Sequence, residues 1–361
     1  MTTKAFSQNY VWMFVVITAL AGCVPSCRQR VNVSSRMPVQ EIDWTGTTGF
    51  REWGQTDDGF FGISVESRAL LMWKWTGETM ARGEEVELPD VLDVIVLPRG
   101  EYLAHRSPAS GKGPWSLTLA SLVTNEIIQE WPPPKFFGYG QAGSSQNRKF
   151  VAVMLKDDIS APAPDYDWDN PCRRIGLLGV ASKELRWVME HRGRVYGDIR
   201  RVTSSNDGKY IAIAGWENGI AVFDIDAGAM KWFKKPKGVV NFGKAEFSSD
   251  GETLYAGDTG GGTICAFEAG TGNLIQTWCA TATGKSIYGQ RISSFAISPD
   301  GTWLAAGTGP TGDVFLFDLI STETKPIILP HGLSTMDSSK NNSNNFVSWD
   351  VYYGIWTTST H

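Results

Sequence analysis

Strand-length apolar stretches, separated by short polar turns, recur along most of the chain. In "FAISPDGTWLAAGTGPTGDVFLFDL", residues 295–319, two such stretches flank a turn, and a loop leads to a third. Side chains two positions apart share their character in "TWLAAGT" and "KYIAIAG", as on a β-strand. Asp-Gly between two apolar runs is a strong hairpin signal, because Gly accepts positive φ. The pattern predicts successive β-hairpins, and we find no long stretch with helical spacing.

The hairpin pattern recurs along the chain. Related segments begin at residues 56, 97, 144, 204, 248 and 298, and the Asp-like turn position falls at 58, 99, 147, 207, 250 and 300. The mean interval is about 48 residues, within the range of propeller blades and helical arrays. The alternation excludes the helical arrays.

Each unit contains four strand-like stretches. A loop containing Gly leads to a third strand such as "IAVFDI" or "DVFLFDL", and a fourth strand often carries Trp, as at Trp131, Trp187, Trp232 and Trp278. Four strands per unit predict an all-β propeller over residues 41–361. We favour seven blades, with six or eight as alternatives. The last blade would combine residues 344–356 with 38–46 as its outer strand, which removes an exposed sheet edge.

The unit resembles the WD-repeat and YVTN-type β-propeller superfamily in its order "SPDG", "LAAG", "VFLFD". The segment "TGNLIQTW" is also similar to the quinoprotein-type repeat. The Gly-His pair and the Trp-Asp ending of strict WD repeats are absent; only Phe223-Asp224 and Phe317-Asp318 approximate the ending. The resemblance therefore implies the fold, and it does not carry over the polar network of that family.

The amino-terminal residues predict an export signal. Lys4 precedes an apolar run from Val11 to Gly22, which is shorter than the roughly 20 residues that span a bilayer. Leu20-Ala21-Gly22-Cys23 resembles the bacterial lipoprotein signal, in which the Cys receives lipid. We expect residues 1–22 to be removed, Cys23 to be lipidated, and residues 23–40 to form a flexible tether. The alternatives are an ordinary cleaved signal and an uncleaved anchor.

Composition narrows the function only slightly. The net charge of −5 gives no reason to expect nucleic-acid binding. Besides Cys23 and Cys27, the chain has Cys172, Cys265 and Cys279, and no Cys-x-x-Cys pair indicates zinc. The last two flank the turn-like "AGTGN", so they either form a disulfide across a hairpin or remain two separate thiols.

No catalytic or metal-binding motif is recognised. The chain has four histidines, His105, His191, His331 and His361. The first two are interpreted as surface or structural residues, and His361 is expected to be mobile at the terminus. The loop that carries Asp157, Asp158, Asp165, Asp167 and Asp169 has oxygen ligands that suit Ca²⁺, but it lacks the EF-hand order and is interpreted as a solvated insertion. The glycines of residues 256–263 lack the Lys-Ser/Thr of a phosphate loop and predict a hairpin turn. We predict no cofactor.

An aromatic-Gly pair precedes several inner strands and gives the candidate binding site. The expected residues at the mouth of the central channel are Tyr139, Gln141, Tyr196, Asp198, Phe242, Lys244, Tyr288 and Gln290. One interpretation is a funnel for a partner segment, since aromatic residues supply binding hot spots. The other is that each aromatic packs between blades while Gly permits the turn.

Two functions follow from these observations. The first is a non-catalytic interaction module or scaffold, exported and lipid-anchored to a bacterial membrane, facing the periplasm, with another envelope protein as partner. The alternative is a propeller enzyme or a binder of small molecules or glycans at the channel mouth, for which Asp198 and Asp258 are the candidate carboxylates. Fold alone does not decide between them.

Overall fold

The computed structural model describes 17 segments of the chain. They are residues 11–16, 39–40, 50–55, 59–64, 69–75, 80–88, 91–97, 100–106, 116–133, 137–157, 172–192, 199–281, 291–298, 301–308, 314–320, 325–329 and 354–359. The only helical segment among them is the three-residue 3-10 turn Trp216–Asn218. No helix in this part of the chain is long and apolar enough to cross a membrane.

Six four-stranded antiparallel sheets follow one another along the chain. Blade 1 contains β3 (Phe50–Gln55), β4 (Gly59–Ser64), β5 (Ala69–Trp75) and β6 (Met80–Glu87). Blade 2 contains β7 (Val91–Leu97), β8 (Glu101–Arg106), β9 (Ser116–Ser121) and β10 (Ile127–Trp131). Blade 3 contains β11 (Phe137–Ser144), β12 (Phe150–Asp157), β13 (Cys172–Gly179) and β14 (Glu184–Arg192).

The second half of the chain repeats this plan. Blade 4 contains β15 (Arg201–Ser204), β16 (Tyr210–Ala214), β17 (Ile220–Asp224) and β18 (Ala229–Lys234). Blade 5 contains β19 (Phe242–Phe247), β20 (Thr253–Asp258), β21 (Thr263–Glu268) and β22 (Leu274–Cys279). Blade 6 contains β23 (Ile292–Ile297), β24 (Trp303–Thr308), β25 (Val314–Asp318) and β26 (Ile327–Leu329).

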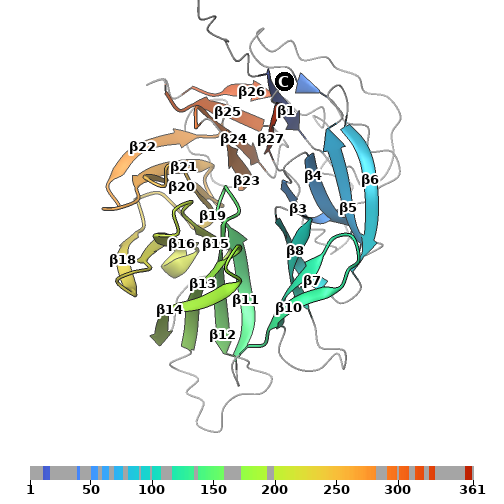
Figure 1. Cartoon of the computed structure of the whole chain (residues 1–361). Helices are drawn as coiled ribbons and strands as arrows, with labels where there is room; N and C mark the ends of the chain where they lie inside the picture. The colour runs from blue at the N-terminus through green and yellow to red at the C-terminus, as the bar shows by residue number, and fades with distance from the viewer. Residues whose placement is uncertain are drawn as a thin grey trace, which may run out of the picture.

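The sheets are arranged radially around a central axis (Figure 1). The first strand of each blade lies innermost, and consecutive first strands contact one another, as β11, β15, β19 and β23 do. This confirms the predicted all-β propeller of four-stranded blades. The four predicted Trp-bearing outer strands are β10, β14, β18 and β22.

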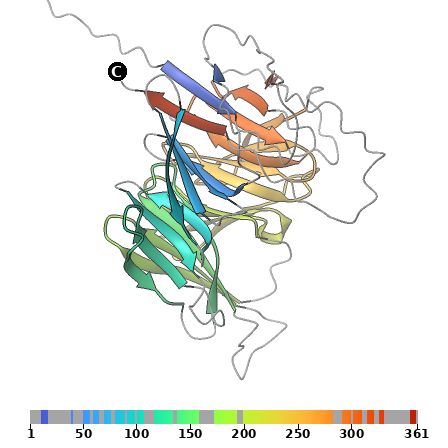
Figure 2. The same ribbon diagram turned by 90° about the vertical axis from the view of Figure 1, so that its right-hand side faces the viewer.

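A seventh, three-stranded sheet combines segments from the two ends of the chain. Its order is β2 (Val39–Gln40), β1 (Val11–Val16) and β27 (Gly354–Ser359). β27 contacts β23, the inner strand of blade 6, and Figure 2 shows β1 and β27 side by side. Both segments predicted for the last blade, residues 38–46 and 344–356, therefore contribute residues to this sheet, and β2 lies at its edge. The middle strand, β1, was not expected, because Val11–Val16 belongs to the predicted export signal. The cleavage of that signal stays a prediction.

The turns between first and second strands explain the recurring Asp-Gly. Gly208, Gly251 and Gly301 have φ of 73°, 76° and 71°, the left-handed region that Gly accepts most readily. Arg148 stands at the equivalent position of blade 3 and has a φ of 54°. The preceding Asn147 therefore takes the Asp position, as the alignment of the repeats predicts.

The core consists of apolar clusters between consecutive blades. Five such clusters join blades 1 and 2, 2 and 3, 3 and 4, 4 and 5, and 5 and 6. Between blades 4 and 5, for example, Val222 and Trp232 pack with Phe242 and Phe267. Each blade is thus stabilised by burying its faces against its neighbours.

Candidate functional site

A β-bulge lies at the same place in the inner strands. The register shifts between Phe50 and Glu52 in β3, and corresponding shifts occur in β7, β11, β19 and β23. In each of these strands, the residue before the register shift precedes the Asp-like turn position by eight residues. The residue after the shift precedes that position by six residues. Bulges redirect side chains and recur beside functional sites.

The six residues after this point form what we call the hub ring. They occupy one level of the six inner strands, and Arg201, which begins β15, takes the position in blade 4. The members are Glu52, Asp93, Gln141, Arg201, Lys244 and Ser294. All six are polar. The positions in blades 1 and 2 are acidic, and those in blades 4 and 5 are basic.

The ring residues with described side chains are not part of the inter-blade core. Gln141, Arg201 and Lys244 are half-buried. The residues that follow them, Ala142, Val202 and Ala245, are buried in the apolar clusters. Because side chains alternate along a strand, the side chains of Gln141, Arg201 and Lys244 lie on the face opposite to these clusters.

One carboxyl group lies on the same strand as a ring residue, one step closer to the turn face. Glu246 follows Lys244 by two positions on β19, and burial raises its pKa to about 7, against the opposing effect of the Arg201 charge. Such a group titrates near neutral pH. Perturbed carboxyl groups of this kind cluster at functional sites, although structural charges are perturbed too.

At the other end of the inner strands, a hydrogen bond connects two blades that are not neighbours. Gln146, in the turn after β11 of blade 3, donates from Nε2 to the carbonyl of Ile297 in blade 6 at 3.3 Å. This contact joins opposite sides of the ring of blades at the turn face. The hub ring lies at the opposite end of the inner strands, which makes that end the candidate entry face.

Of the eight residues predicted at the channel mouth, four are described, and they occupy two different positions in the inner strands. Tyr139 and Phe242 occupy equivalent positions just before the bulge, and Gln141 and Lys244 belong to the hub ring. Tyr196, Asp198, Tyr288 and Gln290 lie outside the described residues. The position of Tyr139 and Phe242 is taken by Ile292 in blade 6.

Phe242 fits the packing interpretation. Its side chain is fully buried, and its ring lies edge-on to Phe267 with 6.1 Å between centroids. Sequence reasoning missed Glu52, Asp93, Arg201 and Ser294. The fixed distance of six residues to the turn was the signal that could have found them.

Asp258, one of the two carboxylates considered for catalysis, has a structural role. It is fully buried. Its Oδ1 accepts hydrogen bonds from the backbone N–H groups of Val240, Asn241 and Gly260 at 3.2, 3.0 and 3.0 Å, and its Oδ2 accepts from Gly261 at 2.8 Å. The carboxylate therefore connects the glycine hairpin after β20 to the segment that enters β19.

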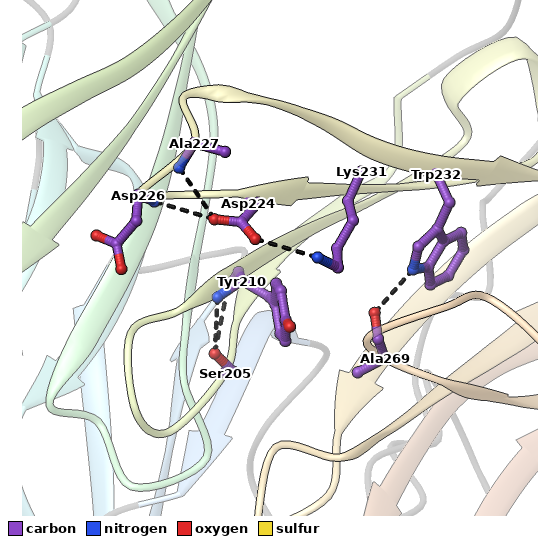
Figure 3. A network of polar contacts seen from close by, with 8 residues as sticks. All are labelled: Ser205, Tyr210, Asp224, Asp226, Ala227, Lys231, Trp232 and Ala269. Atoms are coloured by element: carbon purple, nitrogen blue, oxygen red, sulfur yellow. Dashed lines mark hydrogen bonds and ion pairs between the residues drawn. The ribbon is translucent and has the colours of Figure 1, made fainter.

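The Phe-Asp ending of blade 4 stabilises a turn. Asp224 accepts hydrogen bonds from the backbone N–H groups of Asp226 and Ala227 and pairs with Lys231 Nζ at 3.2 Å (Figure 3). These contacts hold the pKa of Asp224 below its usual range, the Ala227 N–H having the largest effect. Nearby, Trp232 Nε1 donates to the Ala269 carbonyl of the next blade at 2.7 Å.

Comparisons with known proteins agree with this architecture. The model of the WD domain, G-beta repeat, matches residues 281–318, which include most of blade 6. The chain is a β-propeller, and residues 281–318 resemble a WD repeat. No curated protein matches it.

Two solved structures resemble the propeller. One is described as KlHsv2 with loop 6CD replaced by a Gly-Ser linker: its TM-score is 0.50, the identity is 14%, and the match covers 74% of this chain and 76% of that one. The other is a functionally unknown protein from Desulfotomaculum acetoxidans, with a TM-score of 0.51, 16% identity and coverage of 78% and 85%. At these identities the likeness concerns the fold alone.

The two cysteines considered for a disulfide, Cys265 and Cys279, lie on neighbouring strands of blade 5. Cys265 lies opposite Thr277, and Cys279 lies opposite Thr263, so the cysteines are diagonal neighbours and are not joined by a disulfide. Diagonal positions are too far apart for a disulfide in a regular ladder. Burial raises the pKa of Cys265 to about 12, which makes it an unreactive thiol.

The histidines and the acidic insertion give no described metal site. His105 is buried between blades 2 and 3, and burial lowers its pKa to about 4. His191 lies in β14, whereas His331, His361 and the aspartates 158, 165, 167 and 169 lie outside the described residues. Within the described segments, no three His, Cys, Asp or Glu residues are grouped as metal ligands.

Proposed function

We propose that this propeller is a non-catalytic interaction module of the bacterial cell envelope, exported and lipid-anchored through Cys23. In this account the hub ring is the surface that binds a segment of another envelope protein. The observation that carries the proposal is the ring itself: six polar positions at one level, acidic in blades 1 and 2 and basic in blades 4 and 5. Such an arrangement favours one orientation of a charged partner.

The packing of the blades does not account for these polar residues. The apolar clusters already use the alternate positions of the same strands. Arg201 and Lys244 are half-buried and keep part of their surface in water. A binding role explains why charge is kept at this level.

Charge reversal tests the hub ring. A double variant, Arg201→Glu with Lys244→Glu, should lose the envelope protein that wild type retains in affinity capture, because like charges then meet at the interface. A matched variant, Lys149→Glu with Lys183→Glu, changes the net charge equally away from the ring and should keep that protein. Equal retention by both double variants would argue against the hub.

The anchor has its own test. Globomycin, which blocks lipoprotein signal cleavage, should leave an unprocessed membrane-associated precursor, and Cys23→Ser should abolish both processing and the incorporation of labelled fatty acid into the protein. Processing that is indifferent to both changes would contradict lipidation.

A small-molecule ligand or substrate is the second candidate, favoured by Glu246. A carboxyl group with a pKa of about 7 beside Arg201 is suited to proton transfer or to ligand binding near neutral pH. If this is the function, a ligand should raise the melting temperature of wild type at pH 7 and do so much less in Glu246→Gln. A ligand effect that is the same in both proteins would exclude this role for Glu246.

A further inference from the structure

The outer strand of blade 4 begins a stretch with unusual charge. From Ala227 to Ala245 the chain contains five lysines and no acidic residue, although the whole protein has a net charge of −5. Four of the lysines fall within residues 229–240, which comprise β18 and the segment that leads towards blade 5. We call residues 229–240 the lysine rim. Its lysines are Lys231, Lys234, Lys235 and Lys237.

Three of these charges are not neutralised by described residues. Lys231 pairs with Asp224 and points towards it (Figure 3). Lys234, Lys235 and Lys237 form no ion pair with any residue in the described segments, and Lys235 and Lys237 are exposed. The rim therefore presents a local positive field on an otherwise acidic protein.

Large apolar side chains lie among the lysines. Met230, Phe233 and Val240 are 36%, 38% and 48% exposed. The remaining large apolar side chain of β18, Trp232, is buried against blade 5. The rim thus combines basic groups with exposed apolar ones, from the outer strand β18 to the residues that lead into β19.

Protection of a sheet edge explains only part of this composition. Lysines on edge strands prevent pairing with other strands, which accounts for Lys231 and Lys234 in β18. Lys235 and Lys237 lie beyond the strand, where no ladder needs protection, and exposed Phe233 and Val240 work against solubility. Basic residues mixed with exposed apolar ones are the composition of surfaces that bind anionic lipid headgroups.

We propose that the lysine rim docks on the anionic lipid surface of the membrane. The inference rests on the proposed lipid anchor, because an anchored domain stays within reach of the headgroups and a weak contact then suffices to orient it. Lys234, Lys235 and Lys237 provide the attraction to the headgroups, and Phe233 inserts at their level. With one rim on the membrane, the hub ring remains accessible from the side.

Vesicle co-sedimentation tests the rim without the anchor. The full chain carrying Cys23→Ser, which receives no acyl chain, is mixed with vesicles of phosphatidylcholine containing 30% phosphatidylglycerol, or of phosphatidylcholine alone. We expect binding to the anionic vesicles only, with at least a ten-fold decrease in the partition coefficient for Lys234→Gln, Lys235→Gln and Lys237→Gln combined. Raising the salt from 0.1 to 0.5 M should have a similar effect.

The matched control removes the same charge elsewhere. Lys149→Gln, Lys183→Gln and Lys325→Gln combined should leave vesicle binding unchanged, and Phe233→Ser should weaken binding while preserving its salt dependence. The proposal is wrong if both triple variants lose binding equally, or if the wild-type rim shows no preference for anionic vesicles. Binding to a polyglutamate peptide without vesicle binding would also overturn it, in favour of an acidic protein partner. All proteins in this test lack the lipid. A negative vesicle result therefore contradicts the membrane contact of the lysine rim and leaves the proposed lipidation of Cys23 untouched.

Discussion

At the scale of single residues, two tryptophans on neighbouring outer strands differ in one hydrogen bond. Trp232 and Trp278 are both buried, at 8% and 3% exposure. Trp232 Nε1 donates to the Ala269 carbonyl, whereas Trp278 Nε1 has no hydrogen-bond partner among the described residues. Each ring packs into the cluster that joins its blade to the next.

We expect Trp232→Phe to destabilise the protein more than Trp278→Phe. Both changes remove apolar area, but only the first leaves a buried carbonyl without its donor, which costs about 1 kcal/mol or more. Urea unfolding of the two variants measures the difference. Equal losses would show that the Trp232 hydrogen bond contributes nothing.

His105 gives a prediction for acid stability. Its pKa is lowered to about 4 in the folded protein, against 6.5 in the unfolded chain, because burial disfavours the charged form. The unfolded chain therefore binds a proton first, so stability is full above pH 6.5 and falls as the pH is lowered towards 4, by about 3 kcal/mol in all. His105→Gln should lack this part of the pH dependence, as measured by denaturant unfolding from pH 7.5 to 4. Parallel pH profiles for variant and wild type would refute the assignment.

At the scale of elements, the turns on one face form a ladder across blades 3, 4 and 5. Asn206 Oδ1 accepts from the Asn147 N–H at 2.8 Å, and Asn206 Nδ2 donates to the Ser249 carbonyl at 2.8 Å. Within each turn, a serine hydroxyl accepts backbone N–H groups, as Ser205 does from Lys209 and Tyr210. Adjacent blades are thus joined by polar contacts at their turns as well as by apolar clusters.

Asn206→Ala should cost about 1–2 kcal/mol, because it removes two inter-blade hydrogen bonds. Ser249→Ala is the control, since Asn206 binds only the main-chain carbonyl of Ser249. We expect Ser249→Ala to leave the midpoint of urea unfolding nearly unchanged. A loss of similar size in both variants would contradict the ladder.

The sequence predicted the repeated elements well because they depend on local chemistry. Asp-Gly turns require positive φ, and short continuous apolar stretches form strands buried on both faces, so blades and their four strands could be recognised. Even the exception, Arg148, was placed correctly by alignment of the repeats. The turns and strands depend on residues that lie within about ten positions of one another in the sequence.

The hub ring could not be predicted as fully, because it depends on register. The aromatic-Gly pair was a misleading guide: Ile292, three residues beyond Gly289, takes the place of Phe242 in blade 6. The bulge that aligns Gln141 with Lys244 is not visible in composition. Nor could the diagonal offset of Cys265 and Cys279 be predicted without the pairing of β21 and β22.

At the scale of the whole molecule, the proposed processing affects the seventh sheet. Cleavage before Cys23 would remove β1, which pairs with all six residues of β27 and lies between β27 and β2. Backbone amides of residues 354–359 should therefore exchange hydrogen faster in a chain that lacks residues 1–22 than in the full chain. Blades 4 and 5 should exchange equally slowly in both proteins. Unchanged protection of β27 would show that the sheet forms without β1.

Crosslinking from a single position tests whether the propeller recognises a partner at its hub. A photo-reactive amino acid replaces Lys244 in the hub ring or, in the comparison protein, Lys149 at the turn face, and intact cells are irradiated. If the hub binds the partner, we expect a discrete crosslinked envelope protein from position 244 and none from position 149. Crosslinks from position 149 alone, or none from position 244, would contradict it.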